Sequence, residues 1–182
     1  MKKLIRPFTL VEILMVTGMI CLIAAMILVA YNGVYRSWAS RNTIATMKAA
    51  HLALDRYMLE HGAYPAASSR TTLRNVAGTD SKFVKNLLQE CSPYSMLDGN
   101  NVVVFDDFGP HTGVSRVHQI EYVFPANSSN SFALISAGKD GNFGTDDDII
   151  YLPGGTGSRK PGFYMGSTTN NGGISNAEPL AQ

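Results

Sequence analysis

The chain has 182 residues, of which 45% are hydrophobic and 16% charged, and its formal net charge at pH 7 is +1. This is an ordinary globular composition, and the length suits one domain with additional segments. A net charge so close to zero gives no electrostatic case for nucleic-acid binding. The two cysteines, Cys21 and Cys91, lie far apart, one of them inside an apolar run, so a disulfide framework is not expected.

An apolar run lies close to the N-terminus. From Phe8 to Tyr31 there are 24 residues with Glu12 as the only charge, and as a helix rising about 1.5 Å per residue they would reach roughly 36 Å. That length spans a bilayer. The basic residues that precede the run are Lys2, Lys3 and Arg6. The positive-inside rule therefore predicts a cytoplasmic N-terminus and an extracytoplasmic chain after Tyr31.

A secretory signal peptide is the simplest alternative, because such peptides also begin with a basic region and an apolar stretch. The run exceeds the usual apolar region of about 7–15 residues, and its best cleavage site, Leu28 and Ala30, is poor. Glu12 also argues against a signal peptide. A charge inside an apolar span costs roughly 2.5–3.5 kcal/mol at the bilayer centre, so a helix that keeps one is expected to provide a partner for it.

The stretch FTLVE at positions 8–12, behind a short basic leader and ahead of an apolar helix, resembles the processing site of type IV pilins and type II secretion pseudopilins. The resemblance implies that a prepilin peptidase cuts before Phe8, that the new amine is methylated, and that Glu12 pairs with a neighbouring subunit's N-terminus during filament assembly. A free α-amine is largely cationic at neutral pH, which suits a desolvated carboxylate. The helix macrodipole also favours an anion in the first turn, by about 0.3–1 kcal/mol.

Pro7 departs from the family pattern, which has glycine immediately before the phenylalanine. Proline fixes φ and lacks an amide hydrogen, at a place where a protease must hold the chain extended. Two hypotheses follow from this residue. Cleavage between Pro7 and Phe8 predicts a filament subunit whose mature chain begins at Phe8. An intact leader predicts a binding module that stays tethered to the membrane by its N-terminal helix.

A helical pattern continues beyond the span. Spacings of three and four residues connect Ile44, Met47, His51, Leu54 and Met58, and a seven-residue step connects Ala45, Leu52 and Leu59. Together these lines predict an apolar stripe that a sheet or other helices must cover. Gly62 and Pro65 are expected to end the helix. The GAYP sequence at this end also resembles pseudopilins.

Short elements are predicted farther along the chain. The segment 80–91 predicts a helix, with Thr79 or Asp80 as its N-cap and with Phe83, Val84, Leu87 and Leu88 on one face. Segments rich in β-branched and aromatic residues lie at 102–105, 119–124, 131–136 and 148–152. They predict an antiparallel sheet, in which the loop PANSSN joins the second and third segments as a hairpin.

The stretch SAGKDGNFGTDDDII, residues 136–150, contains three consecutive aspartates, whose repulsion favours a nearby cation or water. It resembles the calcium loop of major pseudopilins, in which an Asp-Gly and a later Asp-Ile supply carboxylates. The resemblance makes Asp140 and Asp148 the leading calcium ligands, with Asp146 and Asn142 second. If 146–148 enter a strand, Asp147 points away from the others. An exposed acidic turn is the alternative, whereas an EF-hand fails because Tyr151 stands at its twelfth position.

We do not expect an enzyme. His111 and His118 lie near Asp106 and Asp107 in the sequence, but their spacing matches no familiar zinc set. The sequence also shows no nucleophile beside a base and no phosphate-binding glycine motif. Cys91, at the end of a predicted helix, is expected to be a buried thiol.

The predicted fold is α+β and pilin-like, with a long N-terminal helix whose second half packs on a small antiparallel sheet. Its predicted parts are a leader (1–7), a transmembrane or filament-core helix (8–31), an extracytoplasmic continuation (32–62), a globular head (63–152) and an irregular or partly disordered tail (153–182). The expected function is a structural subunit of a type IV pilus-like or type II secretion pseudopilus filament in the bacterial inner membrane. Its expected partners are filament neighbours, a prepilin peptidase and an inner-membrane assembly platform.

Overall fold

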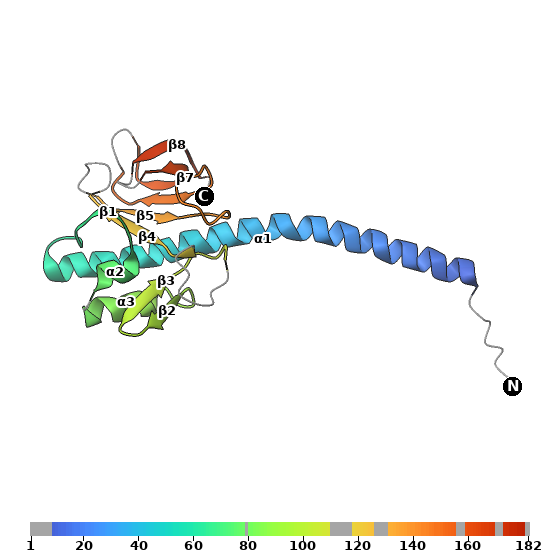
Figure 1. Ribbon diagram of the computed structural model, residues 1–182, viewed down its shortest axis with the longest axis horizontal. Helices are drawn as coiled ribbons and strands as arrows, with labels where there is room; N and C mark the ends of the chain where they lie inside the picture. Colours follow the sequence, from blue (N-terminus) through green and yellow to red (C-terminus); the bar gives the residue numbers. More distant parts are fainter. Residues whose placement is uncertain are drawn as a thin grey trace. The chain divides into compact units, whose positions relative to one another are not determined.

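The computed structural model describes residues 9–78, 80–109, 118–125, 131–155, 159–169 and 173–180. Internal contacts divide the chain into two units, residues 1–37 and residues 38–182. The first unit contains the beginning of helix α1 (Leu10–His61), and the second, here called the head, contains the rest of α1 and every other element (Figure 1).

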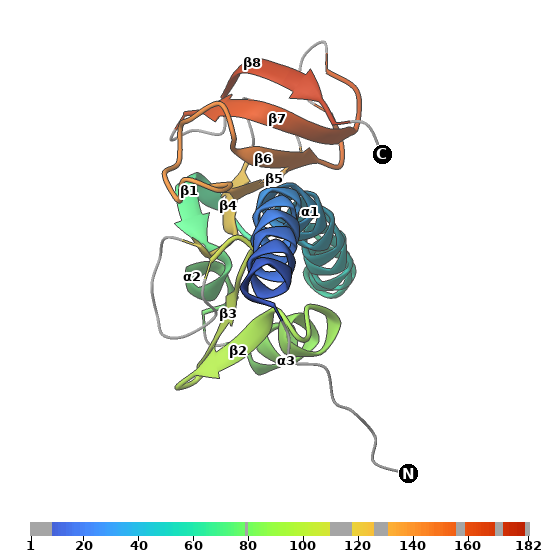
Figure 2. The ribbon, with the colours of Figure 1, turned by 90° about the vertical axis from the view of Figure 1, so that its right-hand side faces the viewer.

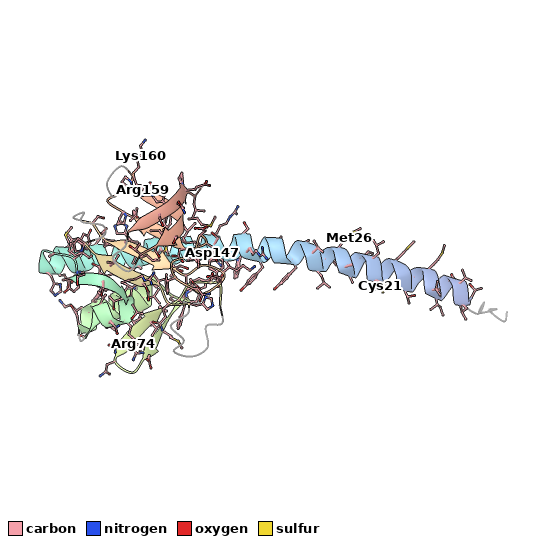
Figure 3. All side chains as sticks on the ribbon, turned by 45° about the horizontal axis from the view of Figure 1, so that its top comes forward. Cys21, Met26, Arg74, Asp147, Arg159 and Lys160 are labelled. Atoms are coloured by element: carbon pink, nitrogen blue, oxygen red, sulfur yellow. The ribbon has the colours of Figure 1, made fainter. Side chains whose placement is uncertain are left out.

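The first part of α1 is apolar and exposed. An 18-residue stretch of the helix has a mean hydropathy of 2.8 and no buried residue, so by length and composition it is able to cross a membrane. No second helix of this kind occurs in the part of the chain that the structure describes. Figure 3 shows the side chains of Cys21 and Met26 projecting outward from this segment.

The head contains a six-stranded antiparallel sheet in the order β1-β4-β5-β6-β7-β8. Its strands are β1 (Ala67–Thr72), β4 (Glu121–Phe124), β5 (Ala133–Ser136), β6 (Ile149–Leu152), β7 (Gly162–Thr168) and β8 (Ile174–Pro179). At the centre, Ile135 pairs with Glu121 on one side and with Ile150 on the other. The predicted strands at 119–124, 131–136 and 148–152 fall in this sheet, and the antiparallel pairing of β4 with β5 is confirmed. The predicted strand at 102–105 belongs instead to a separate two-stranded sheet. Loop residues 126–130 lie outside the described residues.

The second half of α1 packs on this sheet. Met47, Ala50 and Leu54 are fully buried in one cluster with apolar side chains of the sheet, including Tyr122 and Leu134. Alternate residues of the same strands, such as Val123 and Ile135, form a smaller cluster on the opposite face. Both faces of the central strands are therefore buried, which accounts for their nearly continuous apolar sequence.

One of the two predicted lines of the helical stripe is wrong. Leu52 and Leu59 are 53% and 80% exposed, and Ala45 is also exposed, whereas the line through Met47 and Leu54 is buried. Side chains seven residues apart lie on one face of a helix, but the face that is buried is determined by the other elements of the head. Here these elements cover only the neighbouring face.

The other side of α1 in the head is covered by smaller elements. These are α2 (Leu73–Ala77), α3 (Ser81–Glu90), and a hairpin of β2 (Ser95–Asp98) and β3 (Asn101–Val104). Figure 2 shows the helix between the sheet and this group. The predicted helix is confirmed as α3. Asp80 is its N-cap, because the Asp80 side chain accepts bonds from the amides of Lys82 and Phe83. The expected stop of α1 is also confirmed, since Gly62 has φ +78°.

The prediction of an irregular tail is wrong for residues 162–168 and 174–179, which form β7 and β8. These strands contain many Gly, Ser, Thr and Asn residues, so their own sequence gives little strand signal. Tertiary pairing overrides that weak preference, because Tyr164 pairs with Ile150 of the buried strand β6. Phe163 and Tyr164 are buried and hold β7 to the core.

Candidate functional site

The N-terminal site predicted from the sequence lies only partly within the described residues. Pro7 and Phe8 lie outside them, and Glu12 lies in the exposed first turn of α1. The amide of Glu12 donates to the side-chain oxygen of Thr9 at 3.3 Å, so Thr9 acts as the N-cap. Thr9 and Glu12 therefore have the spacing of a capping box, a local feature that the sequence analysis did not identify.

The acidic loop 137–148 is organised around Asp147. One oxygen of its carboxylate accepts from the amides of Lys139 and Asp140, at 2.9 and 3.1 Å, and the other accepts from the Thr145 hydroxyl at 2.6 Å. Gly138, at φ +63°, makes the turn possible, because an added Cβ would lie 2.2 Å from the Asp147 carbonyl oxygen. Asp147 thus closes the loop from within.

The strand geometry from which Asp147 is expected to point away from Asp146 and Asp148 is wrong. Residues 146–148 do not enter a strand, since β6 begins only at Ile149, and the alternation of side chains does not apply to them. Hydrogen bonding in the turn sets the direction of Asp147 instead. Its pKa is lowered: burial alone would raise it, but the bonds from Thr145, Asp140 and Lys139 outweigh burial.

Asp148 is completely buried at the end of this loop. Its Oδ2 accepts from the Gly144 amide and the Thr168 hydroxyl, but its Oδ1 is buried without a hydrogen-bond partner among the described residues. Burial raises the pKa of this carboxyl, against the lowering effect of those bonds and of the Arg70 charge. Arg70 also donates to Thr168 at 3.1 Å, so β1 and β7 meet at this carboxylate.

The other predicted calcium ligands lie on the surface. Asp140, Asn142 and Asp146 are all exposed, and the Asp140 side chain accepts from the Asn142 amide at 2.8 Å. Within the described ranges, no three His, Cys, Asp or Glu side chains are grouped to hold a metal ion. The donor chemistry of the loop nevertheless suits a hard cation, because its side chains offer oxygen ligands and one of these oxygens is buried and unpaired.

A buried polar cluster surrounds Asp106. Its carboxylate accepts from the Ser136 hydroxyl at 2.6 Å and from the Phe108 amide at 3.2 Å, and it contacts Nδ1 of His118 at 3.1 Å. The aspartate lies between the serine and the histidine, so among the described residues the Ser136 hydroxyl contacts a carboxylate and not an imidazole, and Ser136 itself is buried. This order does not suit nucleophilic catalysis, in which histidine activates the serine. Burial raises the pKa of Asp106, against the lowering effect of the bond from Ser136 and of the His118 charge.

A second polar chain joins α1 to the sheet. Nδ1 of His51 lies 2.9 Å from the Tyr151 hydroxyl, and Nε2 lies 3.2 Å from Asp55. Asp55 in turn accepts from Tyr64 at 2.8 Å. His51, which the sequence places on the apolar stripe, therefore connects α1 with β6 and, through Asp55, with the loop that follows α1.

The Cys91 thiol is buried as expected, and burial raises its pKa to about 12, which keeps it protonated.

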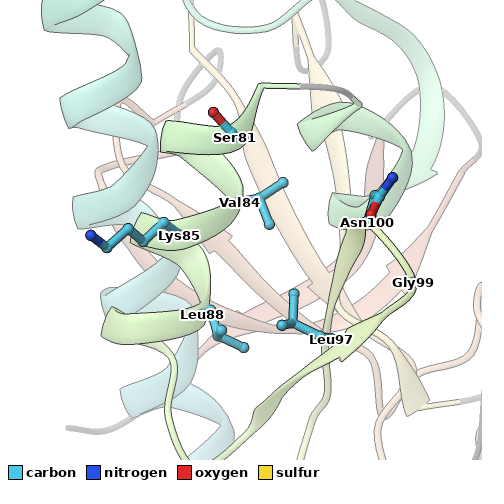
Figure 4. Close-up of a pocket in the computed structure, with 7 residues that line it drawn as sticks. All are labelled: Ser81, Val84, Lys85, Leu88, Leu97, Gly99 and Asn100. Atoms are coloured by element: carbon cyan, nitrogen blue, oxygen red, sulfur yellow. The ribbon is translucent and has the colours of Figure 1, made fainter.

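The head also has a surface hollow of about 520 Å³ between α3 and the β2–β3 hairpin. Val84 and Leu88 of α3 and Leu97 of β2 form its apolar part, and Ser81, Lys85 and Asn100 add polar atoms at its edge (Figure 4). A hollow lined in this way contains no pair of groups for acid–base chemistry. Nothing in the structure indicates what covers it.

No family model, curated protein or solved structure matches the chain. Among the described residues, no contact accounts for the carboxylate of Glu12, in the apolar first part of α1, or for Oδ1 of Asp148, at the end of the acidic loop.

Proposed function

We propose that this chain is a structural subunit of a type IV pilus-like or type II secretion pseudopilus filament. The subunit is inserted in the bacterial inner membrane as a single span, with its N-terminus cytoplasmic and its head extracytoplasmic. A prepilin peptidase processes it, and an inner-membrane platform assembles it with identical neighbours. The observation that carries the proposal is an exposed apolar helix with one carboxylate in its first turn, continuing into an α+β head.

Glu12 could serve filament assembly, or it could serve only as a residue that caps the start of α1. The capping contact in the structure joins the Thr9 oxygen to the Glu12 amide and does not involve the Glu12 carboxylate. A capping box would use that side chain locally, but glutamine would serve there equally well. A carboxylate in an apolar span is costly unless it meets a cation. The N-terminal amine of a neighbouring subunit supplies that cation in the proposed filament.

Replacement of Glu12 by glutamine tests this proposal. Glutamine also completes a capping box, so a purely local role predicts normal behaviour for Glu12→Gln. The filament proposal predicts that the variant inserts at least as well as the natural chain but fails to form filaments. Thr9→Val is the matched control, because it removes the cap and leaves the carboxylate. Membrane fractionation and electron microscopy of sheared filaments measure the two effects separately, and normal filament yield from Glu12→Gln would contradict the proposal.

A tethered binding module is the second candidate, and Pro7 favours it. Proline at the residue before the proposed cut hinders an extended protease-bound conformation. In this alternative the leader stays attached and the same helix serves only as an anchor. The identity of the first residue in the mature chain separates the two candidates.

We also propose calcium as the ion of the acidic loop. Asp148 would supply its buried Oδ1, and Asp140, Asn142 and Asp146 would supply further oxygen ligands from the same loop. Calcium accepts such mixed oxygen shells and tolerates irregular geometry, whereas magnesium demands octahedral coordination. The ion would offset the negative charge of the loop and so stabilise the head.

A further inference from the structure

Aromatic and basic residues return directly after the apolar span. From Thr9 to Ala30 the sequence contains no lysine, arginine or aromatic residue, and Tyr31, Tyr35 and Arg36 then follow within six positions. Tyr31 and Tyr35 are 64% and 40% exposed. Their rings stack, with centroids 6.2 Å apart and planes inclined by 19°. The span thus ends in a paired aromatic surface beside a cation.

The chemistry of these side chains suits the boundary between hydrocarbon and water. A tyrosine ring is apolar along its body and polar at its hydroxyl, and this combination places tyrosine at the headgroup level of membranes. Arginine extends its apolar stem along hydrocarbon and keeps its guanidinium among phosphate groups. Because Tyr31 and Tyr35 are four residues apart, they lie on the same side of α1.

We propose that Tyr31, Tyr35 and Arg36 form an interfacial anchor that binds the phospholipid headgroup layer and sets the depth of the helix in the bilayer. The inference depends on the membrane span of the proposed function. Its length agrees, since the part of α1 from Leu10 to Tyr31 reaches roughly 33 Å at about 1.5 Å per residue, enough to cross a hydrocarbon core of about 30 Å with some tilt. The anchor then lies in the leaflet opposite to the basic N-terminus.

Trp38 allows a direct measurement, because it is the only tryptophan of the chain and is 52% exposed. The full chain is reconstituted in vesicles of phosphatidylcholine and phosphatidylglycerol in a three-to-one ratio, roughly the anionic content that recruits basic side chains. Quenching of Trp38 fluorescence is compared between lipids that carry a nitroxide at the headgroup and lipids that carry it deep in the acyl chain. The matched variants are Tyr31→Ala/Tyr35→Ala and Val34→Ala, since Val34 is exposed between the two tyrosines.

The anchor predicts that Trp38 of the natural chain is quenched more by the headgroup label than by the deep label. The ratio of headgroup to deep quenching should fall in the double tyrosine variant and stay unchanged in Val34→Ala. An unchanged ratio in the tyrosine variant would overturn the anchor while leaving the span intact. A change that disappears when the protein is diluted in lipid would also overturn it, because it would indicate packing between copies. Absence of quenching by either lipid would also overturn the anchor, because Trp38 would then lie in water beyond the headgroup layer.

Discussion

Truncation of Asp147 to alanine should destabilise the head even when no calcium is present. The carboxylate closes the acidic loop through the amides of Lys139 and Asp140 and the hydroxyl of Thr145. Asp146 is the matched control, because it is the preceding aspartate and is exposed. Asp147→Ala and Asp146→Ala therefore remove the same charge and differ in the hydrogen bonds that they delete.

The magnitude follows from the three bonds. A hydrogen bond to a charged group contributes roughly 1.5–3 kcal/mol when it is well shielded. Lys139 and Asp140 are exposed, so water replaces part of what their amides lose. We expect a net cost of about 2 kcal/mol for Asp147→Ala, which lowers the melting temperature by roughly 4–8 °C in a chain of this size. Asp146→Ala should stay within about 0.5 kcal/mol of the natural chain.

The assay is thermal unfolding of the full chain in detergent with excess chelator, followed by near-ultraviolet circular dichroism. The pH dependence gives a second check. Because the folded-state pKa of Asp147 lies below its ordinary value of 3.8, its stabilisation is present above that value and is lost as pH falls through the folded pKa. The difference between the natural chain and Asp147→Ala should shrink in acid. Equal melting of the two aspartate variants near pH 7 would refute the reasoning.

The remaining predictions concern the loop ion, the core and the buried cluster. If calcium binds with a dissociation constant of roughly 10⁻⁴–10⁻³ M, a tenfold higher concentration should raise the free energy of unfolding by about 1.4 kcal/mol relative to chelator. Magnesium should substitute poorly, and Asp148→Asn should remove the calcium effect on melting. Identical melting of the natural chain with calcium and with chelator would exclude the ion. Leu54→Ala should cost about 2–5 kcal/mol in denaturant unfolding and the exposed Leu52→Ala under about 0.5, and equal costs would contradict the packing of α1 on the sheet. Ser136→Ala should cost about 1–3 kcal/mol, because it removes a buried donor from Asp106, and an unchanged unfolding midpoint would show that the bond is unimportant.

The strands that the sequence predicts correctly are those whose own residues carry the signal. Val102, Val103 and Val104 in β3 and the apolar run of β5 have high strand preference and are buried. The N-cap at Asp80 is equally local, since it depends on residues two and three positions away. Features that depend only on neighbouring residues in this way can be predicted from the sequence.

The features that the sequence does not predict depend on distant partners. β7 pairs with the buried strand β6, and Leu52 is exposed because none of the described elements covers its side of α1. The contacts in the acidic loop likewise depend on residues distant in the sequence. Asp147 and Asp148 are adjacent in the sequence, yet one is engaged by the turn and the other by Thr168 from β7, close to Arg70 of β1. No periodicity within 136–150 indicates these contacts.

The central claim is that a peptidase processes this chain and that the mature subunit joins a filament through its new N-terminus. Intact-mass and N-terminal sequence analysis of the chain extracted from bacterial membranes tests it most directly, in cells that contain a prepilin peptidase and in matched cells that lack it. A filament subunit should have methylated Phe8 as its first residue in cells with the peptidase and should keep the full leader in cells without it. Recovery of Met1 or Lys2 as the first residue in both, with Pro7 still joined to Phe8, would contradict the filament subunit and leave the tethered module.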